Sequence, residues 1–460
     1  MATPSNRPFS LWHDDPKLVP FATKALAGDI DADVAIVGAG YTGLWAAYFL
    51  LKQDPKLRVV LLEAETVGYG ASGRNGGWCS ALFPASLKKV ASLSSRDEAI
   101  RLQLTMNKSV AEMGDILKKE GVDCDWQQGG YVSLARNEAQ FVRSRSEVAG
   151  WNSWGFGDDH VRLLDKTEAS RRANATRVLG GTFTPNCAAV HPAKLVVGLA
   201  RVVEKLGAKI YENTRVTKIG ERSLETASGT VKAEVVIRAT EGFTANFGQF
   251  HRDVIPMYSL MIATEPLSDA TWKEIGLSER ETFSDKRHLR IYGQRTKDGR
   301  FAFGGRGAPY HYGSRVSPDF DMDAGVHEML RGILRDLFPV IKDAEFTHAW
   351  GGNLGIPRDW YPSVSFDRKT GFAQAGGYVG DGVSTAFVAG RTLADLIGEK
   401  KTDLTTLPWV NKISPKWEPE PLRWLGVNAV TQAFAQSDRD EARTGRPAGI
   451  AANVWKFIGH

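Results

Sequence analysis

The sequence predicts an α/β unit built on a parallel sheet, joined to an α+β unit built on an antiparallel sheet. Two observations lead to this prediction. Residues 33–63 follow the pattern strand, helix, strand, which is typical of a parallel sheet. From Ile255 to about Phe303, β-type runs recur, which is typical of an antiparallel sheet. A chain of 460 residues is long enough to form both units with large cores.

The first unit carries a dinucleotide fingerprint. An apolar run, Val34 to Val37, has the character of a strand buried on both faces. A helical pattern over residues 44–51 and a second apolar run over 59–62 follow, and Glu63 ends the second run. The turn between the first strand and the helix has glycines at GxGxxG spacing: Gly38, Gly40 and Gly43.

Each part of the fingerprint has a physical task. Gly38 permits the tight turn, Gly40 lets the backbone approach a pyrophosphate, and Gly43 lets helix and strand pack closely. The helix N-terminus offers free N–H groups to the pyrophosphate. Glu63 can accept hydrogen bonds from a ribose diol and would repel the extra phosphate of NADP. The pattern leaves FAD and NAD both open.

A second glycine-rich loop follows at residues 67–84. Ser72, Arg74 and Asn75 lie among its glycines, where backbone N–H groups can face an anion. The loop comes just after the strand that ends in Glu63. We therefore expect it to contact the cofactor as well.

The next block has no nucleotide signature and is assigned to a second domain. Residues 98–121 read as a long amphipathic helix, and residues 138–151 as another. Between them, Cys124 to Leu134 is predicted to be a pair of strands joined by a Gly129-Gly130 turn.

The chain then returns to the nucleotide sheet. Residues 193–206 predict a helix capped by Gly207. Three short strands are predicted after it, at residues 209–211, 216–219 and 231–239, and the last ends in the turn Arg238 to Gly242.

The last third of the chain closes both units. Residues 324–338 predict a helix over the antiparallel sheet. Residues 372–397 read as a strand, a glycine-rich turn and a helix that begins near Val383. The start of that helix offers further unpaired N–H groups to a partial negative charge.

Five landmarks in this order carry a family resemblance: residues 31–44, residues 61–77, the strand at Val216, ATEG at 239–242 and GGYVGDGV at 376–383. Over residues 30–400 the chain resembles the FAD-dependent oxidoreductases of the D-amino acid oxidase-like superfamily, which includes glycine oxidase and sarcosine oxidase. The nearest branch is the gamma-glutamylputrescine oxidase-like one.

The resemblance implies a Rossmann-like FAD-binding domain that is discontinuous in sequence, covering residues 30–92, 185–250 and 346–400. It implies an antiparallel-sheet substrate domain, covering residues 93–184 and 251–345, over the flavin face.

The two ends of the chain lie outside these domains. Residues 1–29 are expected to form an arm that packs on the body, and residues 401–460 a helical, Trp-anchored extension. The possible anchors of the arm are apolar: Phe9, Leu11, Trp12 and Phe21.

The resemblance also assigns the cofactor contacts residue by residue. The fingerprint glycines hold the pyrophosphate and Glu63 the adenosine ribose. Val216 presents its backbone to the adenine, and a helix end under the pyrimidine edge stabilises the negative charge of reduced flavin. The other implied contacts are Ser72, Arg74, Asn75, Gly76, Gly77, Thr240, Gly377, Gly380, Asp381, Gly382, Val383, Ser384 and Thr385.

Two departures from the resembling proteins shape the expectations. Sarcosine oxidase-like members attach the flavin through a cysteine, but residues 352–361 contain none, so we expect non-covalent FAD. Those members also carry an oxygen-activating lysine on a strand near residues 301–304, where this chain has Ala302. The electron acceptor is therefore either oxygen or another acceptor, which makes oxidase and dehydrogenase alternatives.

The predicted reaction is oxidation of the C–N bond of a small amine or amino acid. The neutral amine gives a hydride to the flavin, and the imine product hydrolyses. Candidate catalytic residues around the substrate are Tyr258, Arg290 and Trp350, with Tyr292, Arg306 and Tyr378 beside them. An arginine over the flavin would indicate a carboxylate or phosphonate substrate, which accepts bidentate hydrogen bonds. An aromatic cage without an arginine would indicate a neutral or cationic amine.

The composition argues against several kinds of partner, cellular location and metal site. The net charge of +5 is spread without a basic run, which argues against a nucleic-acid partner. No apolar stretch approaches a membrane span or a secretory signal, and three unpatterned cysteines favour the cytoplasm. No two of the nine histidines lie within four residues of each other, so no metal site is expected. The alternatives are an NAD-linked dehydrogenase and a flavin-bearing subunit of a complex.

Overall fold

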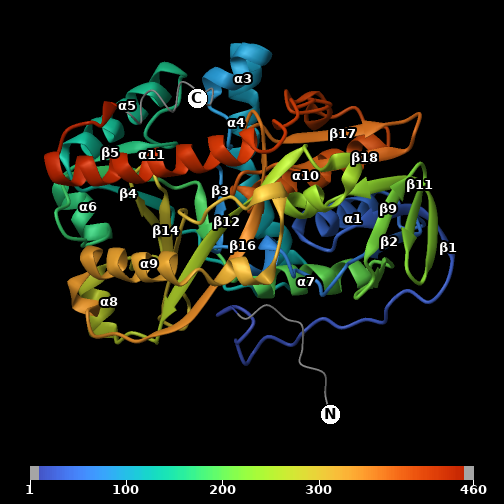
Figure 1. Cartoon of the computed structure of the whole chain (residues 1–460), viewed down its shortest axis with the longest axis horizontal. Coiled ribbons are helices and arrows are strands. Elements are labelled where there is room, and N and C mark those ends of the chain that lie inside the picture. The colour runs from blue at the N-terminus through green and yellow to red at the C-terminus, as the bar shows by residue number, and fades with distance from the viewer. Residues whose placement is uncertain (1–9, 450–460) are drawn as a thin grey trace.

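The computed structural model describes residues 10–449, in which two eight-stranded sheets stand side by side with helices around them (Figure 1). A small third sheet pairs β3 (Trp78–Ser80) with β7 (Cys187–Ala189). No helix in this part of the chain has the length and apolar character needed to cross a membrane.

The first sheet carries the fingerprint and has the order β17-β18-β11-β1-β2-β8, with β10 and β9 continuing from β11. β1 pairs in parallel with both β2 and β11. Ile36 and Leu61 are fully buried, which explains why these strands are continuous apolar runs. The strands are β1 Ile30–Val37, β2 Val59–Leu62, β8 Lys209–Tyr211, β9 Val216–Gly220, β10 Ser223–Thr226, β11 Gly229–Arg238, β17 Ser363–Asp367 and β18 Phe372–Gly376.

Helices α1 and α10 pack closely beside this sheet. A Cβ on Gly390 would lie 2.6 Å from the Cβ of Trp45, so only glycine permits this approach. The Trp45 ring meets Phe387 edge to face at 4.9 Å. The helices on this side are α1 Tyr41–Gln53, α2 Ala71–Arg74, α3 Leu87–Leu93, α4 Arg96–Lys119, α7 Pro192–Lys205 and α10 Gly382–Ile397.

The second sheet has the order β16-β12-β15-β14-β13-β4-β6-β5 and is antiparallel except for the β13–β4 pair. Four phenylalanines form the centre of its core: Phe283, Phe301, Phe303 and Phe338. The strands are β4 Tyr131–Ala135, β5 Arg162–Leu164, β6 Gly180–Thr184, β12 Val254–Thr264, β13 Thr282–Asp285, β14 Ile291–Arg295, β15 Phe301–Gly305 and β16 Phe346–Pro357.

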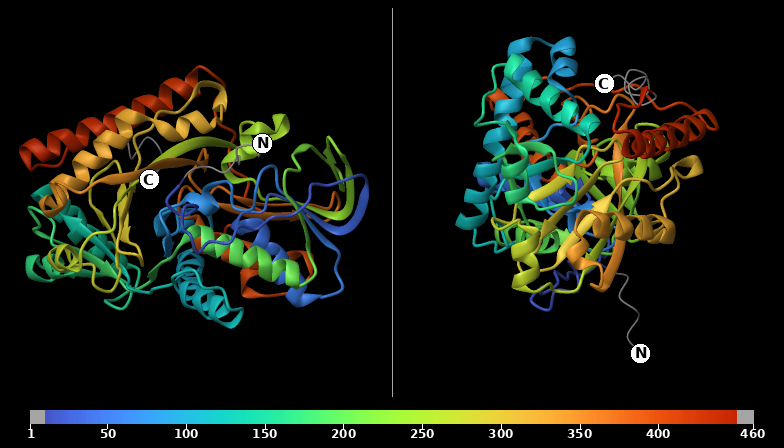
Figure 2. Two further views of the ribbon diagram at one scale, coloured as in Figure 1. Left: turned by 90° about the horizontal axis from the view of Figure 1, so that it is seen from below. Right: turned by 90° about the vertical axis from the view of Figure 1, so that its left-hand side faces the viewer.

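Helices surround the second sheet. Figures 1 and 2 show α9 and α11 on the front side of the molecule. The helices are α5 Glu138–Ser153, α6 Lys166–Arg172, α8 Asp269–Ile275, α9 Ala324–Leu337 and α11 Leu422–Thr444. Short 3₁₀ turns are η1 Glu241–Asn246, η2 Gly248–Phe250, η3 Tyr312–Ser314, η4 Pro318–Met322, η5 Pro339–Ile341 and η6 Asp403–Thr406.

One predicted element is wrong. The segment from Cys124 to Leu134 contains only β4, which starts at Tyr131, instead of a pair of strands. Gln127 makes an isolated bridge to Ala189, and the carbonyl of Cys124 accepts the N–H of His191. The first half of the segment therefore finds its backbone partners in a distant part of the chain, which a local pattern cannot reveal.

The two ends of the chain pack as anchored extensions. Leu11, Trp12 and Phe21 of the arm are buried, while Phe9 lies outside the described residues. Trp12 Nε1 donates to the carbonyl of Asn75 at 2.9 Å, which ties the arm to the second glycine-rich loop. Beyond α10, Trp409 is fully buried as a packing anchor before α11 begins.

The domain boundaries remain a prediction, and the pairing of β16 concerns the predicted start of the last FAD-binding segment at residue 346. It pairs along its whole length with β12 of the second sheet. Residues 346–357 therefore belong to the second sheet, although they were grouped with the FAD-binding segment 346–400. The chain enters the first sheet again only at β17.

Candidate functional site

A cavity of about 1470 Å³ lies where the fingerprint meets the second sheet. The first sheet contributes Gly40 and Glu63 to its wall, and the second glycine-rich loop contributes Arg74. The second sheet contributes Tyr258 from β12, and the turn before α10 contributes Asp381. Segments far apart in sequence thus share one space, as ligand sites at the carboxyl ends of parallel strands require.

Two helices begin at this cavity without a capping side chain of their own. The N-cap of α1 is Gly40, which has no side chain, and the side chain of Asp381, the N-cap of α10, makes no hydrogen bond to the first turn. At α1, the N–H of Tyr41 donates instead to Ser72 Oγ at 2.9 Å. Free N–H groups and two positive dipole ends therefore face the cavity and favour a negatively charged ligand.

The fingerprint glycines have the close contacts that their predicted tasks demand. A Cβ on Gly43 would lie 2.1 Å from the carbonyl oxygen of Gly38, so the first turn of α1 tolerates no side chain at this position. Gly38 itself has φ of +102°, in the region that favours glycine. Gly38 and Gly40 line the cavity, and Gly43 lies behind them.

Glu63 lies at the end of β2 on the cavity wall. Its Oε2 accepts the N–H of Ala39 at 2.8 Å and its Oε1 accepts the N–H of Glu65 at 3.1 Å. Burial raises the pKa of this carboxyl to about 7. Each oxygen keeps lone-pair capacity for a ribose diol. Val216 and Thr240 line the cavity as well.

The second glycine-rich loop is held rigidly at the cavity. Asn75 Oδ1 accepts the N–H of Gly77 at 2.8 Å, and Gln294 Nε2 donates to the carbonyl of Gly76 at 2.8 Å. Arg74 is paired with Asp321 at 2.5 Å in a buried contact. Gly77, packed against Gln294, does not line the cavity, whereas the other predicted residues of the loop do.

The start of α10 is divided between cavity and core. Gly380, Asp381, Gly382 and Val383 line the cavity. The predicted contacts Gly377, Ser384 and Thr385 do not: Gly377 N–H donates to Glu241, Ser384 Oγ to the carbonyl of Ser80, and Thr385 Oγ1 to that of Asp381.

The structure brings most predicted substrate residues together. Those on the cavity wall are Tyr258, Arg290, Tyr292, Arg306 and Tyr378. Trp350 is not among them: it is 1% exposed, and its Nε1 donates to the carbonyl of Arg74 at 2.8 Å. Trp350 supports the loop from behind, so we withdraw it from the substrate shell.

Arg290 and Arg306 form a pair of cations with no carboxylate partner among residues 10–449. They lie at the adjoining ends of β14 and β15, where the N–H of Arg306 donates to the carbonyl of Arg290 at 3.0 Å. Arg306 Nη2 donates to the carbonyl of Val379 at 2.5 Å. Burial and the charge of Arg290 lower the pKa of Arg306, but a guanidinium remains protonated in proteins.

The other basic side chains of the cavity wall have acidic partners. Arg143 is paired with Glu441, Lys286 with Glu147 and Arg287 with Asp285, and Arg74, Arg215, Arg358 and Arg423 are paired in the same way. Burial raises the pKa of Asp381 to about 6, and the two free arginines oppose that shift. The unpaired positive charge is therefore concentrated at Arg290 and Arg306.

Two polar residues of the wall were not predicted. Glu241 follows Thr240 in the ATEG segment, and its carboxyl accepts the N–H groups of Gly355, Gly377 and Tyr378. Burial raises its pKa to about 7. Asn353 is 2% exposed, and both polar atoms of its amide lack a partner in the described part of the chain. The available signal for Glu241 was an acid three residues after the end of β11. The sequence around Asn353 offered no such signal.

The family model described as FAD dependent oxidoreductase (DAO) matches residues 33–396. A probable oxidoreductase, OrdL, of Rhizobium meliloti (strain 1021) is 32% identical over 389 residues, covering 83% of this chain and 86% of that protein. The gamma-glutamylputrescine oxidoreductase of Escherichia coli (strain K12) is 29% identical over 387 residues, with the same coverage of each.

Among solved structures, glycine oxidase from Geobacillus kaustophilus superposes with a TM-score of 0.69 at 24% identity, covering 83% of this chain and 99% of that one. This likeness shows the fold. Together the comparisons confirm the predicted superfamily, fold class and FAD cofactor, which favours the FAD-dependent interpretation over the NAD-linked alternative.

The residues present fit FAD. The uncapped start of α1 and the close approach at Gly40 suit a pyrophosphate, and Glu63 suits the adenosine ribose. The unpartnered amide of Asn353 requires a polar group inside the cavity. The cavity also extends beyond the fingerprint to the two arginines, which leaves room for a substrate.

Replacing Glu63 with alanine tests the ribose contact. We expect FAD binding to weaken by about 1.5–3 kcal/mol, the range for a hydrogen bond to a charged group. Titration of apoprotein with FAD, followed by flavin fluorescence, measures the change. The Glu225→Ala variant, which removes a surface acid of β10, is the control. Equal FAD affinity in Glu63→Ala and wild type would contradict the assignment.

Glu241 predicts a pH-dependent stability. Its pKa rises from 4.5 to about 7 on folding, so the protonated carboxyl favours the folded state. Its contribution is fully present below pH 4.5 and is lost as the pH rises through 7, a change on the order of 3 kcal/mol. Denaturant unfolding of wild type and Glu241→Gln from pH 4.5 to 8 measures it.

The difference between the two unfolding free energies isolates Glu241, because the shifted carboxyl of Glu63 is common to both proteins. Parallel stability curves for wild type and Glu241→Gln would show that this carboxyl is not shifted.

Proposed function

Because this chain belongs to the DAO family of FAD-dependent oxidoreductases, we propose that it oxidises the C–N bond of a small amino acid or carboxylated amine. The imine product is then hydrolysed to a carbonyl compound and an amine or ammonia. Bound FAD supplies the hydride acceptor for this chemistry. The names of two relatives, gamma-glutamylputrescine oxidoreductase and glycine oxidase, support a substrate of this class.

The observation that carries the substrate class is the pair Arg290 and Arg306. Both lie on the cavity wall, and neither has a carboxylate partner in the described chain. Two forked donors side by side suit a carboxylate, which can accept parallel hydrogen bonds from them. A cationic amine alone would be repelled by this pair, so we favour a substrate that carries both an amine and a carboxylate.

The other cavity residues position the substrate. Tyr258 is fixed by its hydroxyl, which donates to the carbonyl of Ser317 at 3.2 Å and accepts its N–H at 3.1 Å. Tyr292 is fixed by a hydrogen bond to Ser259 at 2.8 Å. These rings form rigid apolar walls that exclude water from the reacting carbon. An amine that arrives unprotonated needs no protein base, because its own lone pair drives hydride release.

The cofactor is proposed to be non-covalent. None of the three cysteines lines the cavity, since Cys79, Cys124 and Cys187 are all buried elsewhere. Ala302 lies in the core beside Trp12 and Trp350 and offers no charge to oxygen. The electron acceptor is therefore oxygen, with hydrogen peroxide as product, or a separate electron carrier.

An anaerobic substrate screen tests the reaction. We expect an amino acid or carboxylated amine to bleach the oxidised flavin spectrum, faster as the pH rises toward the pKa of the bound amine. Admission of air with a peroxide assay separates oxidase from dehydrogenase. Bleaching by a hydroxy acid or by NAD(P)H, with no response to any amine, would overturn the proposal.

Substitution of Arg290 by alanine tests the carboxylate contact. We expect kcat/KM for the amino acid substrate to fall about 10–150-fold, equivalent to about 1.5–3 kcal/mol. The amine with the same carbon skeleton but no carboxylate should change little. Arg222→Ala, on the surface at β10, controls for loss of an arginine. An equal fall for both substrates would place Arg290 outside the carboxylate site.

A further inference from the structure

The C-terminal helix α11 forms a wall of the cavity although it lies beyond the family match, which ends at residue 396. One face of α11 lines the cavity, at the spacing of successive helical turns: Arg423, Gly426, Val427, Val430, Thr431 and Phe434. Figure 1 shows α11 running across the half of the molecule built on the second sheet, away from β1 and β2. The helix thus closes the substrate end of the cavity.

The first half of α11 is tied to the segment that follows Arg306. The N–H of Tyr310 donates to Asn428 Oδ1 at 3.0 Å, and Asn428 Nδ2 donates to the carbonyl of Tyr310 at 3.1 Å. The Tyr310 hydroxyl donates to Glu420, which also pairs with Arg423 at 3.1 Å. This segment can therefore not move independently of the helix.

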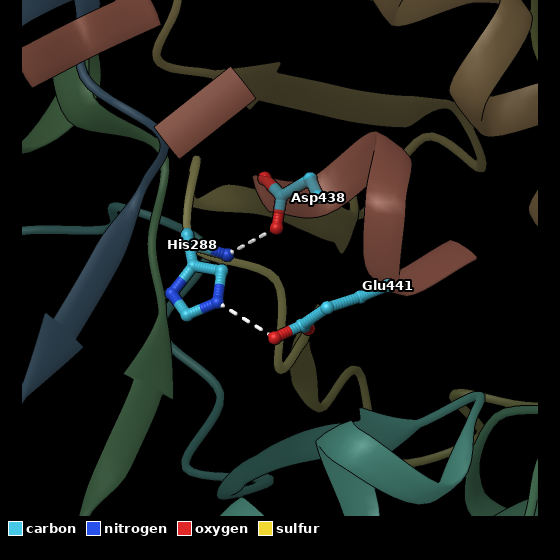
Figure 3. Close-up of side chains that lie close together, drawn as sticks. All are labelled: His288, Asp438 and Glu441. Carbon is cyan, nitrogen blue, oxygen red and sulfur yellow. Dashed lines mark hydrogen bonds and ion pairs between the residues drawn. The ribbon is translucent and has the colours of Figure 1, made fainter. Parts of the chain in front are cut away.

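The second half of α11 is tied to the segment that precedes Arg290 (Figure 3). Asp438 accepts the N–H of His288 at 2.7 Å and the N–H of Leu289 at 2.8 Å. Glu441 Oε1 lies 3.0 Å from His288 Nε2, and both its oxygens accept from Arg143. The residue after Leu289 is Arg290 itself.

The cluster His288, Asp438 and Glu441 is a tether rather than a metal site. Its carboxylate oxygens already accept two backbone N–H groups and the guanidinium of Arg143. The Phe434 ring lies parallel to the His288 ring at 6.0 Å, which joins the tether to the cavity wall. Ligand atoms engaged in this way serve to hold the helix.

We propose that α11 determines substrate specificity. Phe434 limits the length of the substrate, and the tethers at Asn428 and Asp438 position Arg306 and Arg290 for the carboxylate. The inference rests on the proposed function for its substrate class, but the length limit rests on the cavity wall alone. Asp438 and Asn428 are positioning residues, since they act through the two arginines.

The length limit is tested in the FAD-loaded enzyme without turnover. Linear monocarboxylates from acetate to octanoate are titrated, and the change in flavin absorbance reports binding. We expect wild type to show a cutoff in chain length and Phe434→Ala to shift it by at least two methylenes toward longer chains.

The contact between Asp438 and the segment before Arg290 is tested by measuring KM for the amino acid substrate. Asp438→Ala should raise KM for the amino acid at least tenfold, with kcat changed less than twofold and FAD content unchanged. Asp438→Asn, which keeps one acceptor oxygen, should recover part of the loss. Asp440→Ala, on the same helix, is the matched control, because the Asp440 side chain contacts Gln436 and Arg443 and does not bond to the segment before Arg290. Asn428→Ala loosens the other tether if Asp438→Ala does not fold.

The outcomes separate this inference from the proposed function. If no amine reduces the flavin but Phe434→Ala still shifts the carboxylate cutoff, the proposed reaction is wrong, whereas the proposal that Phe434 limits ligand length is supported. An unchanged cutoff in Phe434→Ala, or carboxylates that fail to bind wild type at any length, would contradict the proposal that Phe434 limits ligand length. A fall in kcat at constant KM in Asp438→Ala would contradict the proposal that Asp438 positions Arg290 for the carboxylate.

Discussion

The close packing of α1 against α10 is the constraint on which the rest of the structure depends. Gly390 lets the two helices touch at Trp45, and this brings both N-termini to the same cavity. Neither helix caps its own first turn, and apart from the N–H of Tyr41, which donates to Ser72, the N–H groups at these helix starts are available to a ligand. Both dipoles point their positive ends inward, an arrangement that suits a pyrophosphate and the negative charge of a reduced flavin in one site.

The substrate end of the cavity depends on a different constraint. Within residues 10–449, Arg290 and Arg306 on adjoining strand ends form no ion pair, whereas the other basic groups of the wall are paired with acids. Unpaired guanidinium groups are tolerated where a ligand supplies the counter-charge. A helix outside the family match then holds the segments that carry these arginines. In the proposed function, recognition of the substrate is therefore separated from the shared cofactor chemistry.

The features that the sequence predicted correctly are local. The fingerprint is readable because strand, glycine turn, helix and Glu63 lie within about thirty residues and each part has a fixed physical task. The features that it missed depend on contacts between distant segments. The strand expected near Cys124 fails because its partners lie near residue 190, and Trp350 leaves the substrate shell because it supports Arg74 from behind. The role of α11 is likewise invisible without the cavity.

The most direct test of the account is a single anaerobic turnover with product analysis. One equivalent of a carboxylated amine is mixed with the FAD-loaded enzyme, and flavin reduction is compared with the carbonyl compound and ammonia or amine released. The account predicts one carbonyl product for each flavin reduced, formed at the carbon that carried the nitrogen. Flavin reduction with the C–N bond intact, or a carbonyl formed at another carbon, would contradict it.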